Sequence, residues 1–494
     1  MSMSIKAIVL LWVGTWIGLL LWQWLVGKRA DRLIPQSIRL AIFAIPTSVY
    51  LLPDINLWFI FMAVMVPICC AMRNTPPLQA YICLLALVPA VTYSARIGSA
   101  YLFDLSGYEA FGIGFGIVAF TMPRAPGRPK GVAADILFSL LILTLFAFQI
   151  QDGEFGARKS VETVATMIIP YVALRRTIRS PQSVQLVAAA FVFSAIIVSG
   201  IALIEWLWRW PIYHSAYGHF GIETTGTSAW AKMRGSNLRI PATFIESTAF
   251  GVFLSLAVVA TACQRQLFQT RNKQYLALGL LAFITFLTYS RGAVIAIFVG
   301  TVAMMMARGL LARSLATIAA FGVLGALTFA LASWNSGLED IIRPETGGKI
   351  EYRSEFWRLG TEMVWQNPWA GHTSKAINEY MKEITGEGFV DPVNTYLYFS
   401  IRAGLTGGLV LILSVLIPLA FLWSARRRLP TYSQQANLGM VFGWLSIMAF
   451  HFAVTSFHER NPLWLFLCLA MTAALLGSPR KRTQPVISAQ PQEA

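Results

Sequence analysis

Long apolar runs separated by short basic segments dominate this chain. Hydrophobic residues make up 56% of its 494 residues and charged residues only 13%, which excludes an ordinary soluble domain. The sequence therefore predicts an all-α, polytopic integral membrane protein with about 14 or 15 transmembrane helices. Runs long enough to cross, or nearly cross, a hydrocarbon core lie near residues 6–26, 38–52, 55–72, 78–94, 106–122, 133–150, 160–174, 183–206, 243–262, 276–289, 291–308, 314–333, 396–423, 437–455 and 462–477.

Lysine and arginine residues collect at every second loop, as they do on the cytoplasmic side of membrane proteins. Examples are Lys28 with Arg29, Arg175 with Arg176, and the run Arg426–Arg428. This alternation predicts an N-terminus outside and a C-terminus inside. It also accounts for the net charge of +16, which therefore gives no indication of nucleic-acid binding.

Two segments predicted to lie outside, 208–242 and 334–394, stand out by their length. Within the second, Glu355–Gln366 has a helical pattern in which Phe356, Leu359, Met363 and Trp357 supply an apolar face. The predicted organisation is N-terminal transmembrane helices (1–207), a first outer loop (208–242), further transmembrane helices (243–333), a large outer loop (334–394), C-terminal transmembrane helices (395–477) and a disordered cytoplasmic tail (478–494).

Three arginines fall at the predicted outer boundary or in the outer loops. Arg291 lies between two apolar runs in the sequence Ser-Arg-Gly-Ala, Arg239 precedes an apolar run, and Arg353 opens the loop helix. A guanidinium group binds phosphate with two parallel hydrogen bonds and stays charged when partly desolvated. Three such groups in one pocket would suit a lipid-linked diphosphate. The alternative is that each reaches the membrane interface or pairs with a neighbouring carboxylate such as Glu246.

Four motifs extend this pattern along the chain. They are Arg239-Ile-Pro-Ala-Thr-Phe, Thr288-Tyr-Ser-Arg-Gly-Ala, Arg353-Ser-Glu-Phe-Trp followed by Asn367-Pro-Trp-Ala-Gly-His, and Asn394-Thr-Tyr-Leu followed by Arg402-Ala-Gly-Leu. In order, spacing and predicted placement, they resemble the O-antigen ligase and O-antigen polymerase superfamily of bacterial membrane glycosyltransferases. The resemblance covers roughly residues 235–425 and implies a GT-C-like fold with a long periplasmic loop.

The resemblance implies transfer of a glycan from an undecaprenyl-diphosphate-linked oligosaccharide to an acceptor hydroxyl at the periplasmic face of the inner membrane. Arg239, Arg291 and Arg353 would bind the diphosphate and stabilise its developing charge without a metal ion or cofactor. Arg358, Asn394 and Tyr396 would position the acceptor or the loop; these six side chains form the predicted binding site.

The sequence leaves the proton-accepting residue open. Val393 stands where ligases of this superfamily carry a histidine proposed to activate the acceptor hydroxyl. His372, Glu246 and Asp391 are the alternatives for this catalytic role. Because the missing histidine belongs to the ligase pattern, the sequence favours a polymerase for exopolysaccharide or O-antigen. A ligase that uses lipid A core or another end-acceptor is the alternative.

Two other classes of protein compete with a glycosyltransferase. A transporter of lipid-linked sugars commonly shows internal repeats and ionisable residues near the membrane midplane, whereas this sequence shows no repeat and its informative charges lie at the predicted outer surface. An assembly subunit without activity would tolerate Arg291→Ala. For the glycosyltransferase, the expected partners are the lipid bilayer, a flippase and a chain-length regulator, with no nucleic acid.

Overall fold

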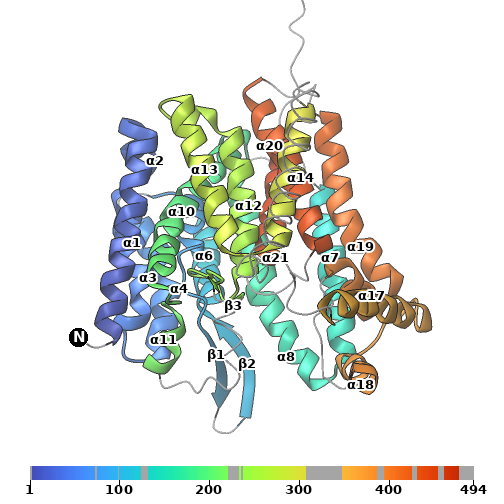
Figure 1. Ribbon diagram of the computed structural model, residues 1–494. Coiled ribbons are helices and arrows are strands. Elements are labelled where there is room, and N and C mark those ends of the chain that lie inside the picture. Colours follow the sequence, from blue (N-terminus) through green and yellow to red (C-terminus); the bar gives the residue numbers. More distant parts are fainter. Residues whose placement is uncertain are drawn as a thin grey trace, which may run out of the picture.

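The computed structural model describes residues 3–72, 75–97, 100–123, 132–220, 233–234, 237–307, 348–385, 394–425, 431–453 and 461–477. Helices dominate these residues, and most of them run side by side in Figure 1. Four helices, Met3–Arg29, Val132–Gln151, Pro181–Trp208 and Thr395–Ala425, are long and apolar enough to cross a membrane. The protein is therefore an all-α polytopic membrane protein, as predicted.

The first part of the chain, drawn from blue to green in Figure 1, contributes helices to both sides of the bundle. Its helices are α1 (Met3–Val26), α2 (Ala30–Leu33), α3 (Gln36–Leu51), α4 (Ile55–Ala71), α5 (Pro77–Leu85), α6 (Gly107–Thr121), α7 (Val132–Gln151), α8 (Glu154–Thr163), α9 (Ile169–Thr177), α10 (Pro181–Trp208) and α11 (His214–His219). A π-helical turn, Val164–Ile168, joins α8 to α9.

The second part of the chain completes the bundle. Its helices are α12 (Ser247–Cys263), α13 (Arg271–Leu287), α14 (Arg291–Ala307), α17 (Gly348–Gln366), α18 (Ser374–Thr385), α19 (Thr395–Ala425), α20 (Thr431–Ala453) and α21 (Asn461–Leu476). In Figure 1 the N-terminus, α11, α17 and α18 lie at the same lower end, which we call the loop end. The predicted topology requires this common placement; which side of a membrane the loop end faces stays a prediction.

Side chains at several helix starts satisfy the first backbone N–H groups. Asp54 accepts hydrogen bonds from the backbone of Asn56 (2.7 Å) and Leu57 (3.2 Å) at the start of α4. Thr270 accepts one from Lys273 (3.3 Å) at the start of α13. These N-terminal caps fix where the apolar runs enter the bundle.

Glycines allow α1 and α10 to pack with their backbones in contact. A Cβ atom added to Gly200 would lie 2.1 Å from the carbonyl oxygen of Gly14, and one added to Gly18 would lie 2.7 Å from the Cα of Ile197. Small residues four apart on one helix are a common means of close packing between membrane helices. These glycines therefore hold the N-terminal helix against the centre of the bundle.

The predicted span 78–94 is wrong. Helix α5 ends at Leu85, and the chain then enters an antiparallel hairpin of β1 (Thr92–Ile97) and β2 (Ala100–Ser106) that projects at the loop end. The connecting residues Leu87, Val88 and Val91 are fully buried. This stretch is apolar because it packs inside the protein, and proline at position 89 does not supply the backbone N–H that a continuing helix needs.

The predicted loop helix Glu355–Gln366 is confirmed as the last part of α17. Phe356, Leu359 and Met363 are buried against Leu397 of α19 and its neighbours. Trp357 is 43% exposed, so its proposed place on the apolar face is wrong. The predicted span 314–333 and the tail 478–494 lie outside the described residues.

Candidate active site

The turn between α13 and α14 carries the Ser-Arg-Gly-Ala motif. Thr288 and Ser290 are buried, and the Thr288 hydroxyl accepts a hydrogen bond from the Ser290 backbone N–H at 3.2 Å. Between them Tyr289 has a φ of 50°, a left-handed conformation that is uncommon for a residue with a side chain and often marks a functional turn. Arg291 begins α14 and is exposed. The turn thus combines a positively charged side chain with the N-terminus of a helix, and both features favour a bound anion.

Arg239 lies against the same turn. Its Nε donates to the carbonyl of Thr288 at 3.3 Å, and the neighbouring Ile240 N–H donates to the carbonyl of Leu287 at 3.3 Å. Burial lowers the pKa of the Arg239 guanidinium, and the charge of Glu246 opposes that shift. The structure therefore brings Arg239 to the turn that carries Arg291, although the two are far apart in the sequence.

Glu246 lies immediately before α12. One of its carboxylate oxygens accepts a hydrogen bond from the Thr248 hydroxyl at 2.9 Å. Its negative charge raises the pKa of Arg239, against the effect of burial, so the two side chains interact electrostatically.

A buried carboxylate missed by the sequence reasoning supports the Arg239 segment. Glu205, near the end of α10, has no exposed surface and accepts hydrogen bonds from the backbone N–H groups of Ile212 and Ala242, both at 2.9 Å. Ala242 has a φ of 50°, so Glu205 holds a strained residue in the Arg239 motif. An acidic residue inside an apolar run was the signal that could have revealed it.

The candidate residues His372 and Arg358 of the large loop contact other residues of the same loop. The His372 ring donates from Nε2 to the carbonyl of Met363 at 2.8 Å, because a carbonyl oxygen can only accept, and Nε2 is then not available as a base. Arg358 is exposed and forms a surface ion pair with Glu362 at 3.5 Å. Asp391 and the side chain of Arg353 lie outside the part of the chain that the structure describes.

Asn394 and Tyr396 join the start of α19 to α20. The Asn394 amide accepts from the Leu397 N–H and donates to the carbonyl of Phe452, both at 2.9 Å. The Tyr396 hydroxyl donates to the carbonyl of Met448 at 3.4 Å. These bonds position the helix that carries the fourth motif; contact with an acceptor stays a prediction.

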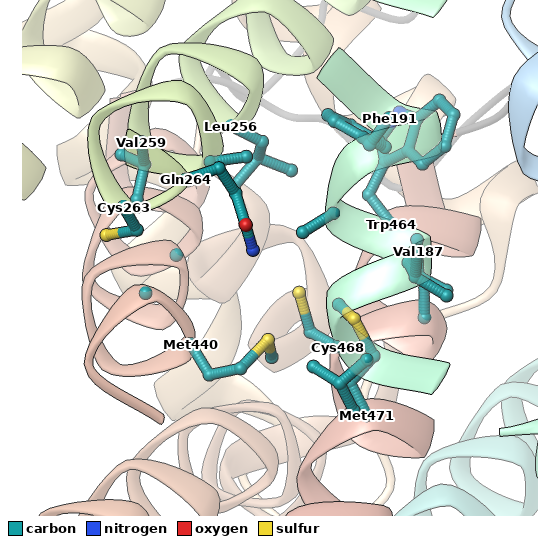
Figure 2. Close-up of a pocket in the computed structure, with 16 residues that line it drawn as sticks. Val187, Phe191, Leu256, Val259, Cys263, Gln264, Met440, Trp464, Cys468 and Met471 are labelled. Carbon is teal, nitrogen blue, oxygen red and sulfur yellow. The ribbon is translucent and has the colours of Figure 1, made fainter. Parts of the chain in front are cut away.

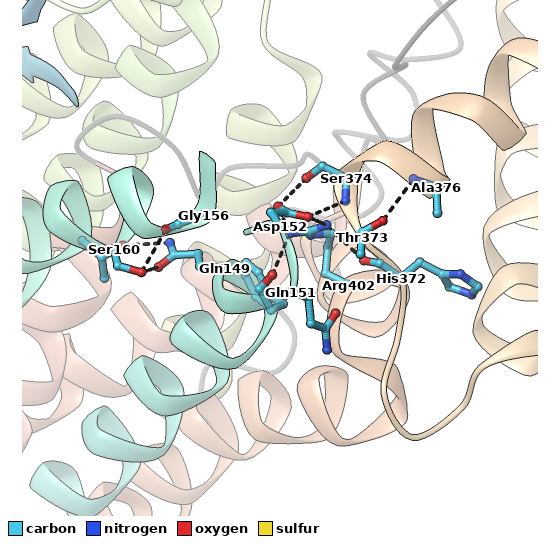
Figure 3. Close-up of polar contacts among 12 residues, drawn as sticks. Gln149, Gln151, Asp152, Gly156, Ser160, His372, Thr373, Ser374, Ala376 and Arg402 are labelled. Atoms are coloured by element: carbon cyan, nitrogen blue, oxygen red, sulfur yellow. Dashed lines mark hydrogen bonds and ion pairs between the residues drawn. The ribbon is translucent and has the colours of Figure 1, made fainter. Parts of the chain in front are cut away.

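A buried ion pair ties the large loop to the first half of the chain (Figure 3). Arg402, 2% exposed, donates from Nη2 to Oδ2 of Asp152 at 2.6 Å, and from Nη1 to the carbonyl of His372 at 3.0 Å. The backbone N–H and hydroxyl of Ser374 both donate to Asp152 at 2.8 Å. Burial alone would raise the pKa of the Asp152 carboxyl, but the hydrogen bonds from Arg402 and Ser374 lower it below its ordinary value.

The glycines of two motifs are required by this junction. Gly404 has a φ of 67°, and a Cβ there would lie 2.4 Å from the carbonyl oxygen of Pro368. Gly371 has a φ of 71° and meets the backbone of Arg402 equally closely. The long-loop motif and the Arg402 motif therefore pack against each other backbone to backbone.

Two cavities differ in their chemistry. A cavity of about 70 Å³ between α10, α12, α20 and α21 is lined by apolar and sulfur-containing side chains, with the Gln264 amide pointing into it (Figure 2). A larger cavity, of about 380 Å³, lies between α7, α8, β2 and α19; we call it the polar chamber. Its lining includes Glu109, Asp152, Lys159, Glu162, Tyr398 and Arg402.

Comparison with known proteins agrees with the geometry. Residues 276–412 match a family described as O-antigen ligase. This O-antigen ligase domain supports membership of the O-antigen ligase and polymerase superfamily. None of the curated proteins compared with the chain matches it. Membership supports a glycosyltransferase-like role in the processing of lipid-linked glycans within a membrane.

Two residues of the candidate site, Arg239 and Glu246, lie before the matched segment. Arg291 and Arg402 lie within residues 276–412, whereas Arg239, Glu246 and Asp152 precede them. Within the described residues, no group of three or more His, Cys, Asp or Glu side chains is placed to hold a metal ion. The first half of the chain thus supplies both a candidate ligand of the diphosphate and the partner that anchors the loop.

Proposed function

We propose that this protein is a polymerase of polyprenyl-diphosphate-linked oligosaccharide repeats that acts at the periplasmic face of the bacterial inner membrane. The observation that carries the proposal is that Arg239 is bonded to the turn that leads into Arg291, in a chain whose family domain supports the processing of lipid-linked glycans. The preference for a polymerase rests on Val393, which replaces the histidine of the ligase pattern. In this proposal the loop end faces the periplasm, and a flippase supplies the repeats.

Arg239 and Arg291 would bind the diphosphate of the donor, together with Arg353. The acceptor hydroxyl attacks the anomeric carbon of the donor glycan, and the bond from that carbon to the diphosphate oxygen breaks. The diphosphate leaves with the bonding electron pair, and fixed guanidinium groups stabilise the charge that develops on it. The backbone bonds that hold Arg239 in place reduce the reorganisation needed during the reaction.

Glu246 is the residue that we propose as the proton acceptor. The charge of Glu246 opposes the lowering of the Arg239 pKa by burial, which supports a place for Glu246 near that guanidinium. The Nε2 atom of His372 is already bonded to a carbonyl oxygen. A carboxylate beside the arginines could accept the proton of the acceptor hydroxyl while the diphosphate departs.

A ligase is the second candidate, because the matched family is described as O-antigen ligase. The donor chemistry would be the same, and only the acceptor would differ: another lipid-linked repeat for a polymerase, and lipid A core or a comparable end-acceptor for a ligase.

The test is the length and lipid linkage of glycans in cells that lack the gene, complemented with wild type, Arg291→Ala or Arg271→Ala. Arg271 is the matched control, since it is an exposed arginine at the other end of α13. We expect single repeats to accumulate on polyprenyl diphosphate in the periplasmic leaflet, and long polymer to return with wild type and Arg271→Ala only.

Other outcomes would replace the proposal. Long lipid-linked polymer that never reaches its acceptor would indicate a ligase, and repeats trapped in the inner leaflet would indicate a transporter. Full rescue by Arg291→Ala would contradict the proposed mechanism and favour an assembly subunit without activity.

A further inference from the structure

Helix α8 and the π-helical turn after it direct polar side chains toward the polar chamber. Glu162, Thr163 and Thr166 all line the chamber; Thr163 is 4% and Thr166 7% exposed. Val161, on the opposite face, is 50% exposed. Polar side chains that face the inside of a membrane protein commonly line a pathway or a binding cavity. The π-helical turn is a second indication, because such turns occur frequently at functional sites.

Backbone and side-chain donors hold two carboxylates of the chamber in place. Glu109 accepts hydrogen bonds from the Ser106 N–H at 2.8 Å and from the Thr166 hydroxyl. Glu162 accepts from the Asp104 N–H at 3.0 Å and from the Lys159 ammonium at 2.7 Å. Since a carboxylate has about four acceptor positions, each retains capacity to accept hydrogen bonds from hydroxyl groups. The chamber therefore offers fixed acceptors to a ligand rich in hydroxyl groups.

The charge of the chamber argues against a phosphate ligand. Its described lining includes the acidic residues Asp104, Asp152 and Glu162 against two cations, Lys159 and Arg402, even without the deeply buried Glu109. Arg402 is already engaged by Asp152, and Lys159 by Glu162. An anionic ligand would meet a net negative field, so the chamber favours an uncharged ligand or one that carries an amine.

The remaining walls and the size of the chamber suit a saccharide. The aromatic rings of Tyr108, Phe148, Phe155 and Tyr398 contribute to the lining, and such rings stack on the C–H faces of sugars. A volume of about 380 Å³ falls within the range of small-molecule pockets. Aromatic faces combined with fixed hydrogen-bond acceptors are the complement of a sugar ring.

The chamber is connected to the candidate active site through a short stretch of chain. The Ala90 N–H donates to the carbonyl of Thr243 at 3.0 Å, and Thr243 lies four residues after Arg239. Thr92, two residues after Ala90, lines the chamber. At no more than about 3.6 Å per residue, the chamber rim and Arg239 lie within roughly 25 Å of each other. One extended oligosaccharide substrate can therefore contact both.

We propose that the polar chamber binds the uncharged saccharide portion of a substrate, separately from the diphosphate at Arg239 and Arg291. The identification of that saccharide as part of a lipid-linked repeat rests on the proposed function. The saccharide can belong to the donor or to the acceptor, and Glu109, Glu162 and the aromatic walls recognise either one.

The test uses the full-length protein in lipid nanodiscs. The probe is a single repeat cut from the surface polysaccharide of the producing cells, with no lipid or phosphate attached. We expect it to slow hydrogen exchange in residues 92–106 and 154–168. Glu162→Gln should weaken its Kd about tenfold or more, the loss expected for a hydrogen bond to a charged group. Phe155→Ala should also weaken it, and because Phe155 is 53% exposed this variant keeps the test valid if Glu162→Gln misfolds.

The matched control is Glu379→Gln, in an exposed pair with Lys375 on α18, and it should leave the Kd unchanged. A repeat that contains a uronic acid should bind at least tenfold more weakly than the same repeat after carboxyl reduction. Protection confined to other segments, an unchanged Kd in both chamber variants, or tighter binding of the acidic repeat would each overturn the proposal.

Transfer assays with the same variants distinguish the two sources of the saccharide. If the donor glycan occupies the chamber, the KM for the donor rises in Phe155→Ala; if the acceptor does, the KM for the acceptor rises. If the protein binds the repeat at α8 but transfers no glycan, the saccharide-binding proposal stands and the proposed polymerase function fails. If the protein transfers glycan but does not bind the repeat at α8, the polymerase function stands and the saccharide-binding proposal fails.

Discussion

Replacing Asp152 by asparagine tests whether one buried ion pair anchors the large loop. The side chains of Asp152 and Arg402 are 8% and 3% exposed, so loss of one partner leaves a buried charge without its counter-ion. Such a change costs about 3–5 kcal/mol. Arg402 keeps its hydrogen bonds to the carbonyls of His372 and Phe148, so we expect the lower end of that range.

The assay is thermal unfolding of the purified protein in one detergent. With an unfolding entropy of about 2 cal/mol/K per residue, a chain of 494 residues shifts its Tm by about 1 °C for each kcal/mol. Asp152→Asn should therefore lower the Tm by about 3 °C or more. Asp31→Asn is the control: its side chain is 68% exposed in a surface pair with Arg39, which is worth about 0–1 kcal/mol.

The double variant Asp152→Asn with Arg402→Met removes both charges and should recover part of the loss, because it leaves no unpaired buried ion. Equal Tm values for Asp152→Asn and Asp31→Asn, or a double variant whose loss equals the sum of the single losses, would refute the reasoning. The folded-state pKa of Asp152 is lowered, so its stabilisation is present above the unfolded pKa near 3.8 and is lost as the pH falls through the folded value. The difference between wild type and Asp152→Asn should accordingly stay constant from pH 5 to pH 8.

Three further substitutions test other parts of the architecture. Arg239→Lys keeps the charge but removes the planar fork, so polymer formation should fall tenfold or more at unchanged expression; normal polymer length would exclude a role in diphosphate binding. Glu205→Gln turns one acceptor of a backbone N–H into a donor and should cost about 1–3 kcal/mol of unfolding free energy, whereas an unchanged Tm would show that Glu205 does not hold the strained segment. Gly18→Leu should abolish folded protein on size-exclusion chromatography because α1 meets the α10 backbone there, and Gly279→Leu, where an added Cβ meets nothing within 4 Å, should not; equal yields would contradict the packing argument.

Hydrophobic patterning predicted the helices because a lipid-facing or core-facing helix needs a long apolar run, and the loop helix because Phe356, Leu359 and Met363 recur at helical spacing. Hydrophobic patterning wrongly predicted a membrane span at residues 78–94, because a segment buried inside the protein is as apolar as one that faces lipid. The sequence suggested a shared pocket for Arg239, Arg291 and Arg353, which stays a prediction; the structure adds a hydrogen bond from the Arg239 side chain to the carbonyl of Thr288, close to Arg291 in the chain.

The remaining features depend on contacts between distant parts of the chain. Asp152 and Arg402 are 250 residues apart in the sequence, and nothing in the sequence around either residue indicates that the two form an ion pair. The polar chamber combines residues from β2, α6, α7, α8 and α19, so no single window of sequence reveals it. In the sequence, Thr163 and Thr166 belong to a short predicted membrane span, and only the packing of the helices shows that both side chains line the polar chamber.

The link between Asp152 and the large loop limits how this protein can be recombined with its relatives. The matched segment 276–412 carries Arg402 and Ser374, but the carboxylate that both of them bind lies outside it. A chimera that exchanges this segment alone would transfer Arg402 without Asp152. The buried arginine would then have only the residue that the recipient carries after α7 as its partner. A graft that also carries α7 and α8 transfers the partner with the loop, so the transferable unit of this glycosyltransferase-like protein is discontinuous in sequence.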